Sequence, residues 1–176
     1  MATEHETTLE ALQTSIRMEI DGKEFYLKAS QAAGNELGKT LLEKLSKEED
    51  SHRIRFETIF QTISASKGWP ASSQQPDGSK SLKSIFAQAT GKLDSEAKAG
   101  TTELDTVQTA MEMENRTYDF YKRRGEEAVQ QAEKDFYETL AVIEQEHHLI
   151  LLDYYEFLED PAAWFVKSER SSMDGG

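Results

Sequence analysis

The stretch MEIDGKEFYLKASQAAGNELGKTLLEKLSKEEDSH, residues 18–52, occurs a second time in the chain in related form. Shifted by 95 residues, positions 7–52 align with positions 102–147 without a gap, and 14 of the 46 pairs are identical. Both copies lack proline, and their apolar residues recur at the three- and four-residue spacing of amphipathic helices. A helix pair used twice therefore predicts an all-α protein.

We expect four long helices, two in each copy of the repeat. Their predicted ranges are 7–33, 37–64, 102–128 and 132–158. Thr7 and Glu10 have the spacing of a capping box, which would start the first helix. Gly34 and Asn35 would end that helix, because both residue types tolerate the left-handed backbone found at helix C-termini.

The connection between the two copies, residues 65–101, has the composition of a loop, with Pro70, Pro76 and several serines and glutamines. It is too long for an ordinary loop in a compact domain, so we expect a crossover that runs the height of the bundle. Residues 84–90 within it could form a short helix. Four long helices with one long crossover are the layout of a ferritin-like four-helix bundle.

The C-terminal tail, residues 159–176, begins with Asp160-Pro161, where we expect the fourth helix to stop. A short C-terminal helix should follow, held on the bundle by Trp164 and Phe165. Residues 1–176 are then one ferritin-like domain. Because a long crossover favours exchange of helices between copies, we expect a homo-oligomer, with a dimer favoured.

Composition excludes several classes of protein. The 33 acidic residues outnumber the 20 Lys and Arg, giving a formal charge of −13 that repels nucleic acid. With no cysteine, disulfides, thiolate metal sites and thiol nucleophiles are excluded. No apolar run is long enough to cross a bilayer, and the first residues, MATEHETTLE, do not resemble an export signal. We therefore expect a cytoplasmic protein with no nucleic-acid or membrane partner.

Three identical pairs of the repeat carry metal-binding side chains. In each copy a lone glutamate lies near mid-helix, and a Glu-x-x-His motif follows 30 residues later on the next helix. Residues at i and i+3 share one helix face, so each motif points a carboxylate and an imidazole in the same direction. We expect all six side chains to converge on the bundle centre as metal ligands: Glu19, Glu49, His52, Glu114, Glu144 and His147.

The mixture of ligands favours a pair of divalent ions. Four carboxylates supply the charge that neutralises two such ions, and imidazole suits iron, zinc and copper. Two lone glutamates with two Glu-x-x-His motifs are the ligand set of di-iron and di-manganese bundles. We therefore expect two iron ions as the cofactors, with manganese or zinc as alternatives.

The neighbours of these six residues have simpler interpretations. We expect Tyr26 and Tyr121 to be aromatic core residues, and His5 and His148 to be surface residues rather than ligands. The acidic neighbours without an identical repeat counterpart are expected to be solvated: Glu48, Asp50, Glu112 and Glu146.

Four motifs, one in each helix, resemble the rubrerythrin-like branch of the ferritin-like superfamily. They are MEIDGKEFY (18–26), EEDSH (48–52), MENRTYDFY (113–121) and IEQEHH (143–148). The resemblance implies that the same six residues are di-iron ligands, and that ferrous iron is oxidised with dioxygen or peroxide. Two features differ from full rubrerythrins, which have a cysteine-rich rubredoxin module and a second glutamate three residues after the helix-three ligand. This chain has no cysteine, and Thr117 stands at that position, where we expect it to face the ions.

We expect a di-iron oxidoreductase, either a ferroxidase or a peroxide-consuming enzyme. Its partners would be dioxygen or hydrogen peroxide, with an external electron donor if turnover needs one. Two alternatives stay open at this stage. One is an iron storage or buffering protein with little turnover, and the other is a structural bundle without a catalytic metal.

Overall fold

The computed structural model describes residues 3–65, 68–70 and 101–173. In these ranges the chain forms five helices. They are α1 (Glu4–Ala32), α2 (Glu36–Ser64), α4 (Thr101–Glu127), α5 (Gln131–Glu159) and the shorter α6 (Pro161–Met173). The four long ones start and end within three residues of their predicted limits. The short helix predicted at 84–90 lies outside the described residues.

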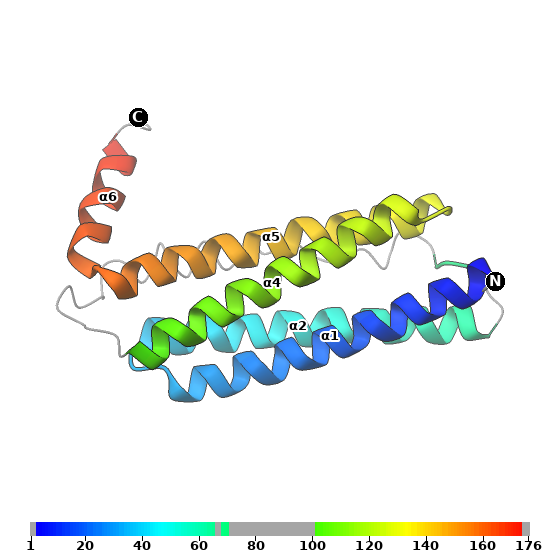
Figure 1. Cartoon of the computed structure of the whole chain (residues 1–176), viewed down its shortest axis with the longest axis horizontal. Coiled ribbons are helices and arrows are strands. Elements are labelled where there is room, and N and C mark those ends of the chain that lie inside the picture. Colours follow the sequence, from blue (N-terminus) through cyan, green and yellow to red (C-terminus); the bar gives the residue numbers. More distant parts are fainter. Residues whose placement is uncertain (1–2, 66–67, 71–100, 174–176) are drawn as a thin grey trace.

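The first four of these helices lie lengthwise beside one another as two antiparallel pairs (Figure 1). The α1–α2 and α4–α5 pairs make by far the most extensive contacts, as expected for a repeated helix pair. The end of α2 and the start of α4 lie at opposite ends of the bundle (Figure 1), so their connection joins the two ends. The fold is thus the predicted four-helix bundle with a linker and a short C-terminal helix.

Helix α1 starts three residues earlier than predicted, because a different threonine caps it. The capping box is formed by Thr3 and Glu6, where the Glu6 N–H donates to Thr3 Oγ1 (3.2 Å) and the Thr3 N–H donates to Glu6 Oε2 (2.7 Å). Thr7 was expected to be the cap, but it lies inside the first turn and donates its hydroxyl to the Thr3 carbonyl. The Thr-x-x-Glu pattern occurs twice, and the copy nearer the N-terminus starts the helix.

The turn between α1 and α2 also differs from the prediction. Neither Gly34 nor Asn35 is left-handed; Asn35 has a φ of −141° and is the N-cap of α2. Its side-chain oxygen accepts from the Gly38 N–H at 2.8 Å, which satisfies one of the free donors at the helix start.

In the part of the chain that the structure describes, the core consists of two hydrophobic clusters. One cluster surrounds the α1–α2 turn and includes Trp164 of α6, whose ring centre is 5.7 Å from that of Phe157. This contact anchors α6 on the bundle, as predicted. The other cluster lies toward the opposite end, around Phe56, Tyr121 and Tyr137. Between them the buried residues are polar.

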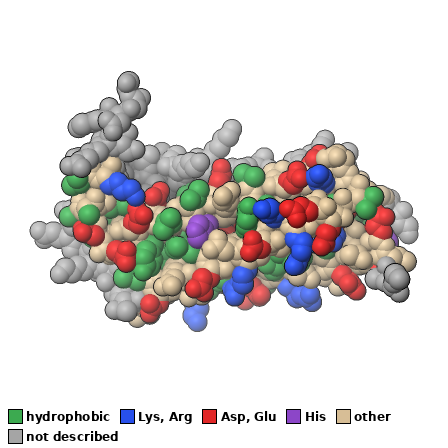
Figure 2. Space-filling model, turned by 45° about the horizontal axis from the view of Figure 1, so that its top comes forward, with side chains coloured by type: hydrophobic (Ala, Val, Ile, Leu, Met, Phe, Trp, Pro, Cys, Tyr) green, Lys and Arg blue, Asp and Glu red, His purple; other side chains and the backbone are tan. Residues whose placement is uncertain are grey.

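Charges of both signs are mixed on the face of the described residues that Figure 2 displays, with Lys and Arg side chains among Asp and Glu. Asp50, which was expected to be solvated, takes part in such a mixture: it is only partly exposed and pairs with Lys23 and Arg53, each at 2.8 Å. Among the described helices, none combines the length and apolar character needed to cross a bilayer.

We predict that Gly38→Ala destabilises the protein, although alanine normally favours a helix by about 1 kcal/mol. A Cβ at this position would lie 1.8 Å from Tyr154 Oη, which is held by hydrogen bonds with Asn35 (2.9 Å) and Glu103 (2.7 Å). Moving that ring should cost about 1–3 kcal/mol, measured as the free energy of unfolding in urea.

Gly125→Ala is the matched control, because it is also a buried helical glycine. Its nearest obstacle is the flexible side chain of Glu138, at 3.2 Å. Stability should be unchanged or slightly higher. An equal loss in both variants would show that Tyr154 does not limit the space at Gly38.

Candidate metal centre

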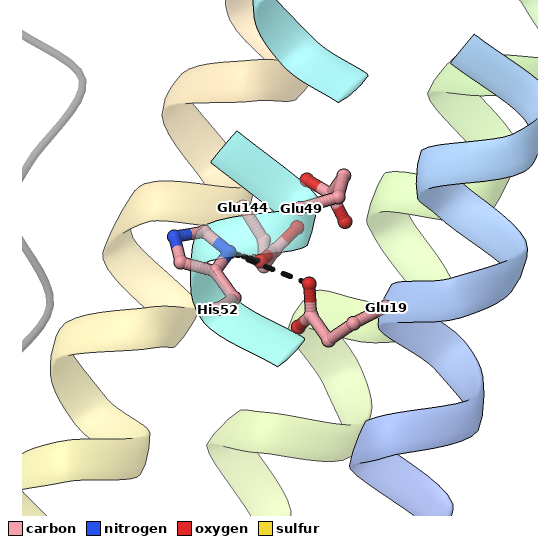
Figure 3. A group of neighbouring side chains, drawn as sticks. All are labelled: Glu19, Glu49, His52 and Glu144. Carbon is pink, nitrogen blue, oxygen red and sulfur yellow. Dashed lines mark ion pairs between the residues drawn. The ribbon is translucent and has the colours of Figure 1, made fainter. Parts of the chain in front are cut away.

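Six side chains from the four long helices meet at one level of the bundle, and each is at most 4% exposed. They form two groups, in which the ligand atoms lie within 4.8 Å of one another. The first group is Glu19, Glu49, His52 and Glu144, drawn in Figure 3. The second group is Glu49, Glu114, Glu144 and His147. Because Glu49 and Glu144 belong to both groups, the arrangement suits two ions that share two carboxylates.

The local sequence explains why these side chains meet. Each of the four glutamates lies close to the midpoint of its helix. Midpoints of packed helices coincide in height whether the helices run parallel or antiparallel. The histidines follow three residues after Glu49 and Glu144, on the same helix faces. All six side chains selected from the sequence are therefore brought together.

Both imidazoles turn the Nδ1 atom toward the carboxylates. His52 Nδ1 is 3.4 Å from Glu19 Oε2 and 3.7 Å from Glu144 Oε1 (Figure 3). His147 Nδ1 is 3.2 Å from Glu49 Oε1. Such separations match ligand atoms arranged around a common ion, whose bonds to nitrogen and oxygen are about 2.0–2.2 Å long.

The centre contains buried polar atoms that the protein does not satisfy. Among the described residues, six atoms of this cluster have no hydrogen-bond partner: Glu19 Oε2, Glu49 Oε1, His52 Nδ1, both Oε atoms of Glu144, and His147 Nδ1. A buried polar atom without a partner costs free energy, and native proteins rarely leave several together. Oxygen and nitrogen donors that face one centre are the donors that divalent metals bind. The residues therefore fit a dinuclear metal site.

The shifted pKa values of the cluster also indicate a site for cations. Burial raises the pKa of Glu19 to about 7 and that of Glu49 to about 8, and it raises the pKa of Glu144 well above its usual value. Burial lowers the pKa of His52 to about 4. Burial also opposes the charged form of His147, but the surrounding carboxylates, Glu114 first, outweigh it and raise that pKa. Without a metal, the cluster reduces its charge by holding protons.

Two tyrosines hold the terminal carboxylates from across the bundle. Tyr26 on α1 donates its hydroxyl to Glu114 Oε1 on α4, and Tyr121 on α4 donates to Glu19 Oε1 on α1. The rings are buried as predicted, but treating them as core packing alone was wrong. Both tyrosines are identical in the repeat and lie two helical turns after a ligand, which is a sequence signal for a role at the site.

Glu48 was expected to be solvated, but it supports a histidine instead. Its Oε2 is 3.0 Å from His147 Nε2, on the side of the ring away from the other carboxylates. A carboxylate in this position fixes the tautomer and orientation of a metal-binding imidazole. The repeat counterpart of Glu48 is Ile143, so the equivalent carboxylate is missing beside His52.

The other flanking residues lie outside the cluster. His148 is half-buried with Nδ1 3.3 Å from the Met111 carbonyl, and it belongs to neither group. His5 and Glu112 are exposed, as expected, whereas Glu146 is half-buried.

Gly22 and Thr117 are equivalent in the repeat and differ in what they allow. A Cβ at Gly22 would lie 2.8 Å from Glu49 Oε2, so only glycine lets this carboxylate lie against α1. Thr117 was expected to face the ions. Its hydroxyl donates to the Met113 carbonyl of its own helix (3.1 Å) and is therefore not turned toward a carboxylate of the cluster.

Comparison with known proteins identifies the family of this chain. A family model described as Rubrerythrin matches residues 10–155, which include all six cluster residues. No curated protein and no solved structure matches.

We predict that the metal-free protein loses stability as the pH rises from 6.5 to 8.5. The folded protein holds protons on Glu19 and Glu49 up to pH values of about 7 and 8, whereas in the unfolded chain these carboxyls have already lost them near pH 4.5. A carboxyl whose pKa is raised by folding therefore stabilises the folded protein at low pH. This contribution is lost as the pH rises through the pKa that the group has in the folded state. The loss should be on the order of 2 kcal/mol, measured by urea unfolding with a chelator at each pH.

With Mn²⁺ bound, the slope should reverse, because protons compete with the metal for the same atoms. His52 opposes the metal-free slope only weakly: its pKa of about 4 leaves it neutral in the folded chain, and the unfolded chain has already lost about half of this proton at pH 6.5. The double variant Glu19→Gln/Glu49→Gln is the control and should flatten the metal-free curve. A metal-free curve that is already flat in the parent would contradict the assignment of these protons.

Proposed function

We propose that this chain, which belongs to the rubrerythrin family, binds two iron ions and oxidises ferrous iron with dioxygen or hydrogen peroxide. The observation that supports this most strongly is the set of six buried, unpartnered donor atoms that face one centre. Zinc and manganese fit the same donors, and the proposal of iron follows from the family.

In this proposal each ion has one terminal carboxylate and one imidazole of its own. Glu19 and His52 hold one ion, and Glu114 and His147 hold the other, as in the two groups of the cluster. Glu49 and Glu144 are shared. Four carboxylates balance the charge of two divalent ions, so the loaded site has little net charge to bury. When bound, the iron pair supplies two electrons to the oxidant.

The surrounding residues position the ligands and keep water out. The tyrosine hydroxyls fix Glu19 and Glu114 from the opposite helix, which leaves one oxygen of each free for an ion. Glu48 fixes the ring of His147. The two hydrophobic clusters lie on either side of the site along the bundle axis and exclude bulk water from it.

Anaerobic titration with ferrous iron should show about two ions bound per chain. Because Glu144 lies in both groups and His52 in one, we predict that Glu144→Ala lowers the stoichiometry most and that His52→Ala removes about one ion. His148→Ala is the matched control and should bind as the parent does. An equal loss in His148→Ala would mean that the wrong histidine was assigned.

The same loaded samples test the reaction. Mixing with dioxygen or peroxide in a stopped-flow instrument should give rapid oxidation, and Mössbauer spectroscopy should detect a coupled ferric pair. Slow oxidation of fully bound iron would favour an iron-buffering protein. Failure to bind iron at all would favour a structural bundle.

We predict that Thr117→Glu speeds peroxide-driven oxidation of the loaded protein. The repeat counterpart of Thr117 is Gly22, whose Cα–Cβ direction points at Glu49, so a long side chain at 117 has a path toward Glu144. A fifth carboxylate would stabilise the more highly charged ferric pair. Thr117→Gln has the same size without the charge and should leave the rate near that of the parent. Equal rates in both variants would show that position 117 does not reach the ions.

A further inference from the structure

The two tryptophans of the chain, Trp69 and Trp164, lie beyond the aligned range of the repeat but share its 95-residue offset. Trp69 packs against the cluster around Phe56, and Trp164 belongs to the cluster at the other end of the bundle. Each end of the bundle therefore has a tryptophan and, nearer the centre, a tyrosine bonded to a site carboxylate. Trp69 and Tyr121 lie at one end, and Trp164 and Tyr26 lie at the other.

The residues between tryptophan and tyrosine differ between the two halves. On the Trp69 side they are three aromatic residues, and their repeat counterparts on the Trp164 side are three leucines. The pairs are Phe56/Leu151, Phe136/Leu41 and Tyr137/Leu42, all buried. Since leucines fill the equivalent space, burial alone does not require aromatic rings here.

The aromatic side chains on the Trp69 side form a continuous path. The ring centre of Trp69 is 6.1 Å from that of Tyr137, which is 5.8 Å from that of Tyr121. Phe56 and Phe136 pack beside this path, at 5.5 Å from Tyr121 and 5.7 Å from Trp69 respectively. Tyr121 then bonds to Glu19 of the metal centre.

The outer end of this path reaches the surface. Trp69 is half-buried and lines a cavity of about 350 Å³ together with Thr3, His5 and Gln130.

At the other end of the bundle, Trp164 also packs on an aromatic ring, that of Phe157 at 5.7 Å, which lies 6.4 Å from the ring of Tyr154. Among the described residues this group makes no ring contact with Tyr26, whose ring pairs with that of its neighbour Phe25 at 5.8 Å.

The chemistry of the path differs from residue to residue. Indole and phenol are the side chains that most readily give up one electron, and phenol loses its proton in the same step. Tyr121 has an acceptor for that proton in Glu19. Tyr137 Oη has no hydrogen-bond partner among the described residues, and the Arg124 guanidinium lies 5.9 Å from its ring centre, which disfavours a positive charge. Tyr137 is therefore suited to bridge two redox-active neighbours rather than to hold the radical.

We propose that Trp69, Tyr137 and Tyr121 form a one-electron relay between the cavity at the bundle end and the metal centre, and that a small one-electron reductant reacts at Trp69. The proposal rests on the proposed redox function of the site. It assigns the entry point for electrons in a chain that has no cysteine-bound redox centre.

Each electron passes in balanced steps. Once peroxide has oxidised the loaded centre, Tyr121 would give that centre one electron and would pass its phenolic proton to Glu19 Oε1, becoming a neutral radical. Trp69 reduces this radical through the Tyr137 ring, and the proton returns from Glu19 to Tyr121. The oxidised indole then takes one electron from the reductant in the cavity, so that the reductant loses one electron and the centre gains one.

The relay can be tested without any metal. In the Trp164→Phe variant, Trp69 is the only indole, and azide radicals made by pulse radiolysis take one electron from it. We expect the indolyl absorption to decay while tyrosyl absorption grows, at a rate independent of protein concentration. The growth should be lost in Trp164→Phe/Tyr121→Phe. It should persist in Trp164→Phe/Tyr26→Phe, which removes the equivalent tyrosine of the other half.

A second measurement uses the iron-loaded protein. After peroxide is added without a reductant, peptide mass spectrometry should find oxidation at Trp69 and not at Trp164, and ascorbate or the Tyr121→Phe substitution should suppress it. In the radiolysis experiment, tyrosyl growth that survives Tyr121→Phe would overturn the relay even if iron is oxidised rapidly. The absence of tyrosyl growth from the Trp164→Phe variant would do the same. Transfer in the metal-free protein without iron oxidation would instead overturn the proposed function and leave the relay standing.

Discussion

Mutual repulsion among four buried carboxylates sets the conditions for the rest of this structure. Glu19, Glu49, Glu114 and Glu144 lie at one level of the bundle, and two imidazoles do not neutralise them. The folded chain must therefore take up either protons or metal ions at this level. Long helices on both sides supply the hydrophobic burial that offsets such a layer. The stability of the protein and the occupancy of its centre are in this way one coupled equilibrium.

The sequence repeat gives the centre its approximate symmetry, and the departures from the repeat remove it. The two halves share their ligands and the tyrosines that hold them, but Glu48 has Ile143 as its counterpart. One histidine thus has a carboxylate behind it and His52 has none among the described residues, so the two ions would meet imidazoles of different basicity. Duplication explains the number of ligands, and later divergence explains why the two halves need not do the same work.

The helices and the six cluster residues could be predicted because each is a property of one helix that recurs in the other copy. Periodicity and i to i+3 spacing describe one face of one helix, and identity across the repeat selected the relevant faces. The missed features are contacts between helices. Tyr26 and Glu114 are 88 residues apart, as Glu48 and His147 are 99 apart, and no local pattern links them. The cap at Thr3 was missed for a different reason, since an equivalent pattern lies four residues later.

A centre that is buried at this level constrains how electrons reach it. Dioxygen and peroxide are small enough to diffuse between packed side chains. A reductant that is itself a protein, or that contains a large ring system, is too large to do so. In the proposed relay, electrons cross the hydrophobic cluster around Phe56, because the rings of that cluster connect the bundle end with the metal centre. At the other end, Trp164 packs on Phe157, but leucines stand at the positions equivalent to Phe136, Tyr137 and Phe56. A leucine side chain offers no orbital through which an electron can pass easily. In this proposal the aromatic rings around Tyr137 give an otherwise nearly symmetric bundle a direction for electron transfer.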